Sequence, residues 1–290
     1  LVIGETADSV LENVSLKGNW QNEELNVDEY YAACPGNVVW TMNGSLLNEN
    51  KIPTFFMKNR VEGKNFAAFA RAFGINLQAP SQSAYRDIDA TFNIIGMPLN
   101  FSVSDLKIAL DKTKAEGLIN FNFEGEQPRY ELDFDSDDIN FDNYLSFSAE
   151  AESLTDKVRQ NIETLAFLKN AQWQIDANIV SAVFRGVPLQ KLALKLNSDK
   201  DAVHILELSA GNILGAEINV ATDVNGIGGE DLAFSNLQYK LNTKDISPII
   251  SKFGMAVPEW DIFKNKPMTA EGTVNGNLHE ADVLTNIVIN

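Results

Sequence analysis

The chain has 290 residues, of which 44% are hydrophobic and 22% charged, and it carries a formal net charge of −17 at pH 7. This length allows a buried core in one large domain or in two smaller ones. The negative charge argues against nucleic acid as a partner, because phosphates are bound by Lys and Arg, and against docking on anionic lipid through a basic patch. The single cysteine, Cys34, excludes an intramolecular disulfide and a metal site made of several cysteines, and we expect it to be a small buried hydrophobic residue.

The two ends of the chain indicate a segment of a longer protein. The chain begins at Leu1 rather than at Met, and its last residues, 285–290 (TNIVIN), read as a strand that is cut short. No signal peptide opens the chain, and no run of 18 apolar residues occurs in it. We therefore expect any membrane anchor of the full-length protein to lie outside these residues.

Apolar and polar side chains alternate through the first half of the chain. The clearest examples are 38–42 (VVWTM), 119–123 (INFNF) and 130–135 (YELDFD). Strict alternation is typical of half-exposed antiparallel strands with one apolar face. Turn residues separate these runs, at 33–37 (ACPGN) and at 124–126 (EGE).

A short amphipathic helix is predicted after this first group of strands, and a similar one near the end of the chain. The first runs from a capping Asn65 to Gly74, and the second runs from Asp245 to Gly254 with the same spacing between cap and glycine. The apolar stripe of the first consists of Phe66, Phe69, Ala70 and Phe73, and that of the second of Ile246, Ile249, Ile250 and Phe253. A third helix start is predicted at Asn140, where Phe141 and Tyr144 follow the cap.

A longer helix is predicted near residues 153–169. Its apolar stripe consists of Leu154, Val158, Ile162, Leu165 and Leu168. This helix divides the chain into a front block of β repeats at 1–148, a helical connector at 149–171 and a back block of β repeats at 172–290. The two blocks form either one continuous sheet or two separate β structures.

The back block again alternates with period two. The alternating runs are 173–180 (WQIDANIV), 192–198 (LALKLNS), 216–224 (AEINVATDV) and 237–243 (LQYKLNT), and the turns between them are predicted at 209–212 (SAGN) and 225–231 (NGIGGED). The chain as a whole is therefore predicted to be mainly β. We expect an elongated, twisted and curved antiparallel sheet built from repeats, with short amphipathic helices that cap it.

Three segments carry a resemblance to the AsmA-like family of bacterial envelope proteins, the relatives of TamB. Residues 103–145 resemble the family's strand, turn and strand that end in a Tyr-Leu element, here Tyr144 and Leu145. Residues 184–224 are similar to its repeat with a glycine-rich turn, and 245–254 (DISPIISKFG) resembles its closing helix. These patterns cover most of the chain, from about Leu16 to Asn290.

The resemblance implies a place and a function. Members of the family are anchored in the inner membrane of Gram-negative bacteria and extend through the periplasm. Their repeats are thought to form a hydrophobic β groove that shields acyl chains during phospholipid transport toward the outer membrane. For this chain the resemblance implies outer-membrane biogenesis, a phospholipid or another acyl-chain lipid as ligand, envelope proteins as partners at the ends, and no cofactor.

The apolar face of the predicted sheet has two interpretations. It either lines a groove for lipid, or it packs against a second layer as a closed core, in which case the chain is a structural or scaffolding module of envelope assembly. The candidate groove residues are Val38, Trp40, Met42, Phe92, Phe121, Phe123, Ile218 and Val220. The sequence leaves open which of them meet lipid and which meet protein.

Other chemistries find weaker support in the sequence. Five carboxylates lie between Asp133 and Asp142, as in some calcium sites and in paired-acid glycosidases, but the EF-hand pattern is missing and the strand pattern turns Asp133 and Asp135 toward solvent. A β domain that binds calcium or carbohydrate is therefore the more distant alternative. The two histidines, His204 and His279, share no motif and no Gly-x-Ser-x-Gly element accompanies them, so we expect no enzyme and no metal site.

Overall fold

The computed structural model describes most of the chain and divides it into two units. The described residues are 11–49, 51–77, 80–145, 171–199, 202–226, 232–253, 265–277 and 280–289. Unit 1 comprises Leu1–Ser146 and unit 2 comprises Phe147–Asn290. The predicted helix at 153–169 lies outside the described residues.

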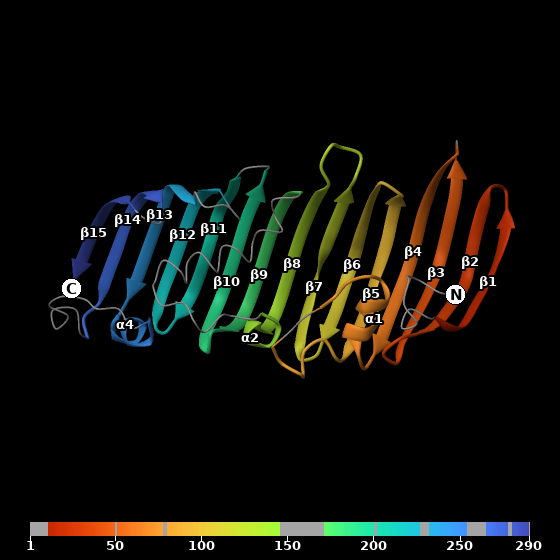
Figure 1. Cartoon of the computed structure of the whole chain (residues 1–290), viewed down its shortest axis with the longest axis horizontal. Helices are drawn as coiled ribbons and strands as arrows, with labels where there is room; N and C mark the ends of the chain where they lie inside the picture. Colours follow the sequence, from red (N-terminus) through yellow and green to blue (C-terminus); the bar gives the residue numbers. More distant parts are fainter. Residues whose placement is uncertain are drawn as a thin grey trace. The chain divides into compact units, whose positions relative to one another are not determined.

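Unit 1 contains eight described strands, each hydrogen-bonded to its neighbours in the chain (Figure 1). The strands are β1 (Glu12–Gln21), β2 (Glu24–Cys34), β3 (Val38–Glu49), β4 (Ile52–Gly63), β5 (Ile88–Met97), β6 (Asn100–Leu110), β7 (Thr113–Asn122) and β8 (Arg129–Asn140). All the pairs are antiparallel, so the predicted antiparallel sheet is confirmed for this unit. Two short helices accompany them, α1 (Phe66–Ala72) and α2 (Phe141–Tyr144).

Unit 2 repeats this arrangement with seven described strands. They are β9 (Gln172–Phe184), β10 (Val187–Ser198), β11 (Ala202–Ile213), β12 (Ala216–Asn225), β13 (Ala233–Thr243), β14 (Met268–Asn277) and β15 (Ala281–Ile289), with helix α4 (Ser247–Phe253) after β13. Each pairs antiparallel with its chain neighbours within the unit. The prediction of a mainly β fold with short helices is therefore confirmed.

The strand register of unit 1 gathers the predicted apolar residues on one face of its sheet. Residues that pair directly across an antiparallel ladder point to the same face. Phe121 pairs with Phe101 and with Tyr130, and Ile119 pairs with Val103 and with Leu132. We call this face the apolar face, and the opposite one, which carries Lys107, Glu116 and Asp135 among others, the polar face.

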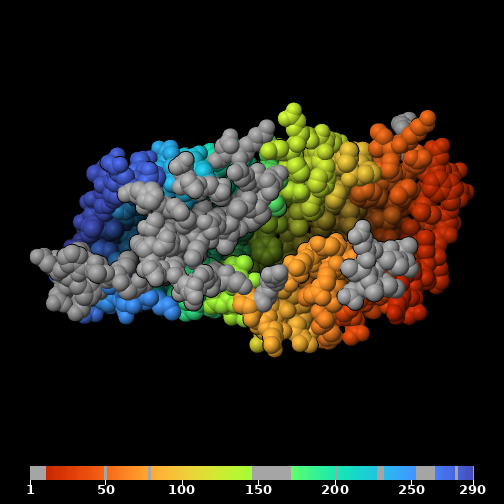
Figure 2. Space-filling view, in the orientation of Figure 1, coloured from red at the N-terminus to blue at the C-terminus, as the bar shows by residue number. Residues whose placement is uncertain are grey.

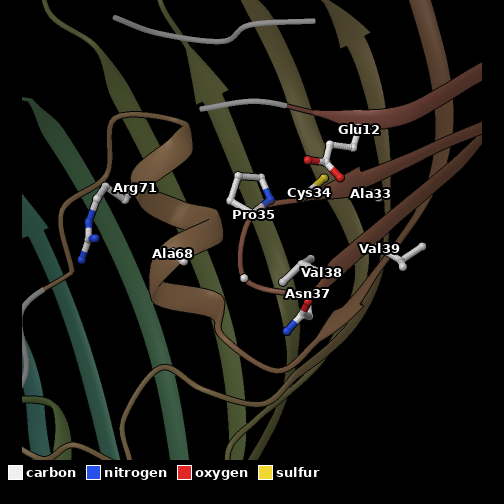
Figure 3. Close-up of a pocket in the computed structure, with 10 residues that line it drawn as sticks. Glu12, Ala33, Cys34, Pro35, Asn37, Val38, Val39, Ala68 and Arg71 are labelled. Atoms are coloured by element: carbon white, nitrogen blue, oxygen red, sulfur yellow. The ribbon is translucent and has the colours of Figure 1, made fainter. Parts of the chain in front are cut away.

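Helix α1 packs on the apolar face at one end of the strands. Asn65 caps it as predicted, because its side-chain oxygen accepts a hydrogen bond from the Ala68 N–H at 3.1 Å. Phe66 and Phe69 pack against a buried cluster that includes Leu11, Ala32, Cys34, Val38, Val61, Ile88 and Ala90. Cys34 is thus the buried hydrophobic residue that the sequence predicts. Figure 3 shows the strands of unit 1 curving behind this helix.

Helix α4 begins one residue later than predicted. By analogy with Asn65 and α1, Asp245 should be the residue directly before the helix, but α4 starts at Ser247. Ile246, rather than Asp245, supplies the carbonyl that accepts the first helical hydrogen bonds, from Ile249 and Ile250. The Asp245 carboxylate still accepts hydrogen bonds from the Ser247 hydroxyl at 2.5 Å and from the Ser247 N–H at 2.9 Å, and these two hydrogen bonds, the first above all, lower the pKa of Asp245. The two helices share a cap chemistry but not an identical register.

The turn predicted at residues 209–212 is wrong. Those residues belong to β11, and the chain reverses at Leu214 and Gly215, whose φ angles are 52° and 89°. Two residues with positive φ form the mirror-type turn that matches the twist of a hairpin. Ala210 stays in the strand because it pairs with Leu192 and Ile218 on the apolar side of unit 2. Packing of this small side chain prevails over the turn propensity of its neighbours.

Glycines with a conformation closed to other residues occur inside three strands. Gly44, Gly96 and Gly276 have φ angles of 150°, 140° and 143°. At Gly96 a Cβ atom would lie 2.5 Å from the carbonyl oxygen of Asn100 and 2.7 Å from the Cα atom of Phe101. Only glycine allows such an approach within a strand.

The carboxylate of Asp111 fastens the loop after α1 to the turn between β6 and β7. It accepts hydrogen bonds from the backbone N–H groups of Tyr85, Arg86 and Asp87 at 2.9–3.1 Å. It also accepts one from the Tyr144 hydroxyl of α2 at 2.9 Å. Burial, followed by this hydrogen bond, raises the pKa of Tyr144 to about 12. One side chain therefore holds three segments of unit 1 together.

Candidate functional site

The apolar face of unit 1 consists of a closed end and a half-exposed end. At the closed end, beneath α1, Val38 is 1% exposed and Val61, Ile88 and Ala90 are 4–5% exposed. Full burial of a Val or Ile side chain stabilises the fold by about 1.5–3 kcal/mol relative to its exposure to water. Val38, a predicted groove residue, therefore lies in the protein core.

The half-exposed end carries two rows of residues that cross the strands from β3 to β8. The rim row, next to the turns, consists of Leu46, Phe55, Gly96, Phe101, Phe121 and Tyr130. The second row consists of Gly44, Met57, Ile94, Val103, Ile119 and Leu132. All twelve residues are half-buried, neither enclosed like the cluster beneath α1 nor freely exposed.

Five aromatic rings meet in the rim row and beside it. Phe101 and Phe121 stack with their ring centroids 4.8 Å apart, and Phe55 lies 6.1 Å from Phe101. Phe123 stacks on Phe121 at 6.3 Å, and Tyr130 meets Phe121 edge-on at 5.7 Å. We call these residues the aromatic cluster. The predicted groove residues Phe121 and Phe123 are thus brought together, and Phe123 is 37% exposed.

The remaining groove candidates of unit 1 lie between the two ends. Trp40 and Phe92 pack against the cluster beneath α1, and Met42 is half-buried on the same face. The indole N–H of Trp40 donates to the side-chain oxygen of Asn59, which is buried, at 3.0 Å. These residues border the half-exposed rows. In Figure 2 the surface of unit 1 recedes between the orange region of α1 and the yellow-green strand ends above it.

Ile218 and Val220 lie on the apolar face of unit 2. Ile218 pairs with Ala210 and Leu241, and Val220 pairs with Leu208 and Tyr239, so the alternation predicted for these strands is confirmed. Both candidates are half-buried. A closed cluster of Leu196, Val203, Val224 and Leu232 lies near one end of these strands.

Two carboxylates of β8, those of Asp133 and Asp135, belong to the polar face, as the strand pattern predicts. Asp133 and Asp135 are exposed, and they pair with Leu118 and Glu116 across the ladder. Asp137 accepts a hydrogen bond from the Lys114 N–H at 3.0 Å, which is the main cause of its lowered pKa. In the part of the chain that the structure describes, no group of three His, Cys, Asp or Glu side chains is placed to hold a metal ion.

His204 lies between the carboxylates of Asp199 and Asp223, a contact that the sequence did not predict. It is a strand residue, as predicted, and its Nδ1 lies 2.6 Å from an oxygen of Asp223, while its Nε2 lies 3.6 Å from Asp199. The hydrogen bond to Asp223 is the main cause of a raised pKa for His204 and a lowered pKa for Asp223. The strand register creates this contact, because His204 pairs with Asp223 on the neighbouring strand. His279 lies outside the described residues.

A cavity of about 730 Å³ lies beside α1, at the turn between β2 and β3 (Figure 3). Its lining includes Glu12, Cys34, Pro35 and Ala68. Burial raises the pKa of the Cys34 thiol, which makes it less reactive. The cavity therefore offers space near α1 but no activated nucleophile.

Comparison of the chain with protein-family models, with curated proteins and with solved structures gives no match. Among the described residues no helix has both the length and the hydrophobicity needed to cross a membrane.

Proposed function

We propose that the chain shields acyl chains of phospholipid on the half-exposed rows of unit 1, as a periplasmic segment of an inner-membrane-anchored, AsmA-like protein. The observation that supports this most is the half-burial of all twelve residues in the rim row and the second row. Each exposed CH₂ group of a lipid costs about 0.8 kcal/mol in water. Apolar side chains that are still partly exposed can contact the acyl chain and remove its CH₂ groups from water, which lowers that cost.

Each row is long enough to hold an extended acyl chain. Six strands lie side by side from β3 to β8, and at a spacing of ~4.8 Å a row that crosses them is roughly 24 Å long. The hydrocarbon core of a bilayer is about 30 Å thick and holds two layers of acyl chains, so one chain occupies roughly half of that thickness. An extended acyl chain therefore fits along either row. The function requires no cofactor and no catalytic residue.

Native mass spectrometry of the chain purified from a bacterial host, with lipid extraction in parallel, tests this function. We expect bound phospholipid in the wild-type chain and its loss in Phe121→Glu, which places a charge in the rim row. Leu118→Glu is the matched control, because Leu118 lies on the polar face of the same strand and is 36% exposed. Circular dichroism and urea unfolding establish that both variants fold.

The second candidate function is a scaffold of envelope assembly without a lipid ligand. The closed cluster beneath α1 supports it, because that end of the apolar face is already filled by protein. A wild-type chain that carries no lipid and takes up no fluorescent phospholipid from vesicles would favour the scaffold and exclude the shielding function.

A further inference from the structure

Strand β15 forms an open edge of the sheet in unit 2. It pairs with β14 on one side, and no described strand lies on its other side (Figure 1). All nine of its residues are exposed. Val283 is 61% exposed and its neighbour Leu284 is 74% exposed, and successive side chains of a strand point to opposite faces. This edge therefore presents apolar side chains to water on both faces of the sheet.

The hairpin that joins β14 and β15 shows which backbone groups of this edge point outward. The Asn277 N–H donates to the Glu280 carbonyl at 2.8 Å, so these two residues form a hydrogen-bonded pair. Hydrogen-bonded and non-hydrogen-bonded pairs alternate along an antiparallel ladder, and the register of β14 and β15 has no shift. The N–H and C=O groups that point away from β14 therefore belong to Ala281, Val283, Thr285, Ile287 and Ile289.

Strand β1, which borders unit 1 beside β2, carries protections that β15 lacks. Its register with β2 shifts twice, between Glu12 and Ser15 and between Lys17 and Gly18. Bulges and lysines are common protections of an edge strand against pairing with another chain. In β15 the register with β14 is unbroken, and Asp282 is the one charged residue. The edge of unit 2 is therefore regular and open to a further strand.

The sequence of β15 is self-complementary when two copies run antiparallel with Thr285 opposite its own copy. The facing pairs are then Ala281–Ile289, Val283–Ile287 and Thr285–Thr285 on the apolar face, and Asp282–Val288 and Leu284–Asn286 on the other face. The three pairs on the apolar face are also those whose backbone groups point outward, so each can exchange two hydrogen bonds. No like charges lie directly opposite each other in this arrangement.

From these features we propose that two copies of the chain pair through β15, antiparallel and about a two-fold axis at Thr285. The proposal goes beyond the proposed function and does not depend on lipid binding. The register centred on Thr285 pairs all nine residues of the strand. A shift by two residues leaves strand ends unpaired, and a shift by one turns the apolar side chains of one copy to the opposite face. In the proposed dimer the apolar face of unit 2 therefore continues from one copy into the other.

Native mass spectrometry and light scattering of the 290-residue chain over a series of concentrations test the dimer. We expect a dimer that dissociates on dilution, and Val283→Pro and Thr285→Lys should each raise its dissociation constant at least roughly tenfold. Val283→Pro removes an outward N–H, which is the position where an edge strand tolerates proline. Thr285→Lys places two like charges directly opposite each other.

The matched control is Leu16→Lys, which introduces the same charge on β1, where Leu16 is 60% exposed. It should leave the dimer unchanged. Circular dichroism and urea unfolding establish that the three variants fold.

Cross-linking tests the register. The Cα atoms of a hydrogen-bonded pair lie about 5.5 Å apart, within the range of a disulfide. Mild oxidation should therefore cross-link two copies of Thr285→Cys, whereas Val283→Cys, which lies opposite Ile287, should remain largely uncross-linked. Both variants retain the buried Cys34, so the wild-type chain under the same oxidation is the control.

Each contrary result overturns a defined part of the proposal. A chain that stays monomeric at every concentration overturns the dimer. A dimer that persists in both Val283→Pro and Thr285→Lys excludes β15 as the interface. Equal cross-linking of Thr285→Cys and Val283→Cys overturns the register. Larger oligomers that Leu16→Lys abolishes would show that β15 pairs head-to-tail with β1 of another copy, which overturns the two-fold arrangement.

Discussion

The indole N–H of Trp40 donates a hydrogen bond of 3.0 Å to the side-chain oxygen of Asn59, on the neighbouring strand. Asn59 is 5% exposed, and its amide group in turn donates to the Met57 carbonyl at 3.0 Å. This polar pair lies on the apolar face, between the cluster beneath α1 and the half-exposed rows. It fixes the position at which the closed core ends.

Replacement of Asn59 by Ala should destabilise the chain by about 1–3 kcal/mol, because the Trp40 N–H loses its acceptor while it stays half-buried. The measurement is urea unfolding, combined with Trp40→Phe in a double-mutant cycle. Asn43→Ala serves as the control, because Asn43 is exposed on the polar face of β3. Additive effects of the two substitutions would contradict the coupling of Trp40 and Asn59.

The substitution Gly96→Ala should cost about 1–3 kcal/mol of stability. Its φ of 140° is closed to alanine, and the new Cβ atom would lie within 3 Å of the backbone of β6. Gly125→Ala is the matched control, since the nearest atom to a Cβ there is 3.5 Å away. Thermal unfolding of both variants checks the difference. Equal melting temperatures would show that β5 does not need this conformation.

Loss of the Asp111 carboxylate should free the loop after α1. Asp111→Ala removes the acceptor of three backbone N–H groups and of the Tyr144 hydroxyl. We expect a loss of at least about 2 kcal/mol, because several donors lose their partner together. Hydrogen exchange of residues 85–87 gives the local readout. Unchanged protection there would refute the fastening role of Asp111.

Stability should decrease in alkaline solution through Tyr144. Its pKa is about 12 in the folded chain, compared with 10.0 for the unperturbed group, so the folded state retains the proton longer than the unfolded state. The stabilisation is complete below pH 10 and is lost as the pH rises through 12. Urea unfolding as a function of pH measures the decrease. Tyr144→Phe should show a smaller decrease across this range, and an identical slope would contradict the assignment to Tyr144.

His204 should titrate above its ordinary pKa, because Asp223 stabilises the protonated ring. The associated stability is complete below the ordinary pKa of histidine and is lost as the pH rises through the raised value. NMR titration of the ring signals measures that pKa. Asp223→Asn should lower it more than Asp199→Asn does, since the Asp199 oxygen lies 3.6 Å from the ring. The reverse order would show that Asp223 is not the main partner.

The strands and their faces could be predicted from the sequence because alternation is a local property. Phe121, Tyr130 and Ile218 lie on the faces that their period-two patterns indicate. The cap at Asn65 follows from equally local chemistry, a side-chain oxygen beside the first free N–H groups of a helix. In such cases a few neighbouring residues decide the structure.

The extent of the closed core could not be predicted in this way. Val38 and Phe121 occupy equivalent places in similar alternating runs, yet only Val38 lies beneath α1, and the packing of that helix is a tertiary contact. The pair of His204 and Asp223 and the contacts of Asp111 depend on register between distant segments. The reversal at Leu214 was missed because leucine rarely adopts a positive φ. Its neighbour Gly215 was the available signal.

The pairing of each strand with its chain neighbours has a mechanical consequence. In unit 1, β1 and β8 are the first and last members of a ladder that follows the order of the chain. A pulling force on the two ends of this ladder loads the hydrogen bonds of an outer strand one after another. Strands fastened only to their chain neighbours then peel away as successive hairpins. The force that this sheet withstands when it is pulled at the two ends of the ladder is therefore set by the residue pairs between two neighbouring strands rather than by the whole sheet.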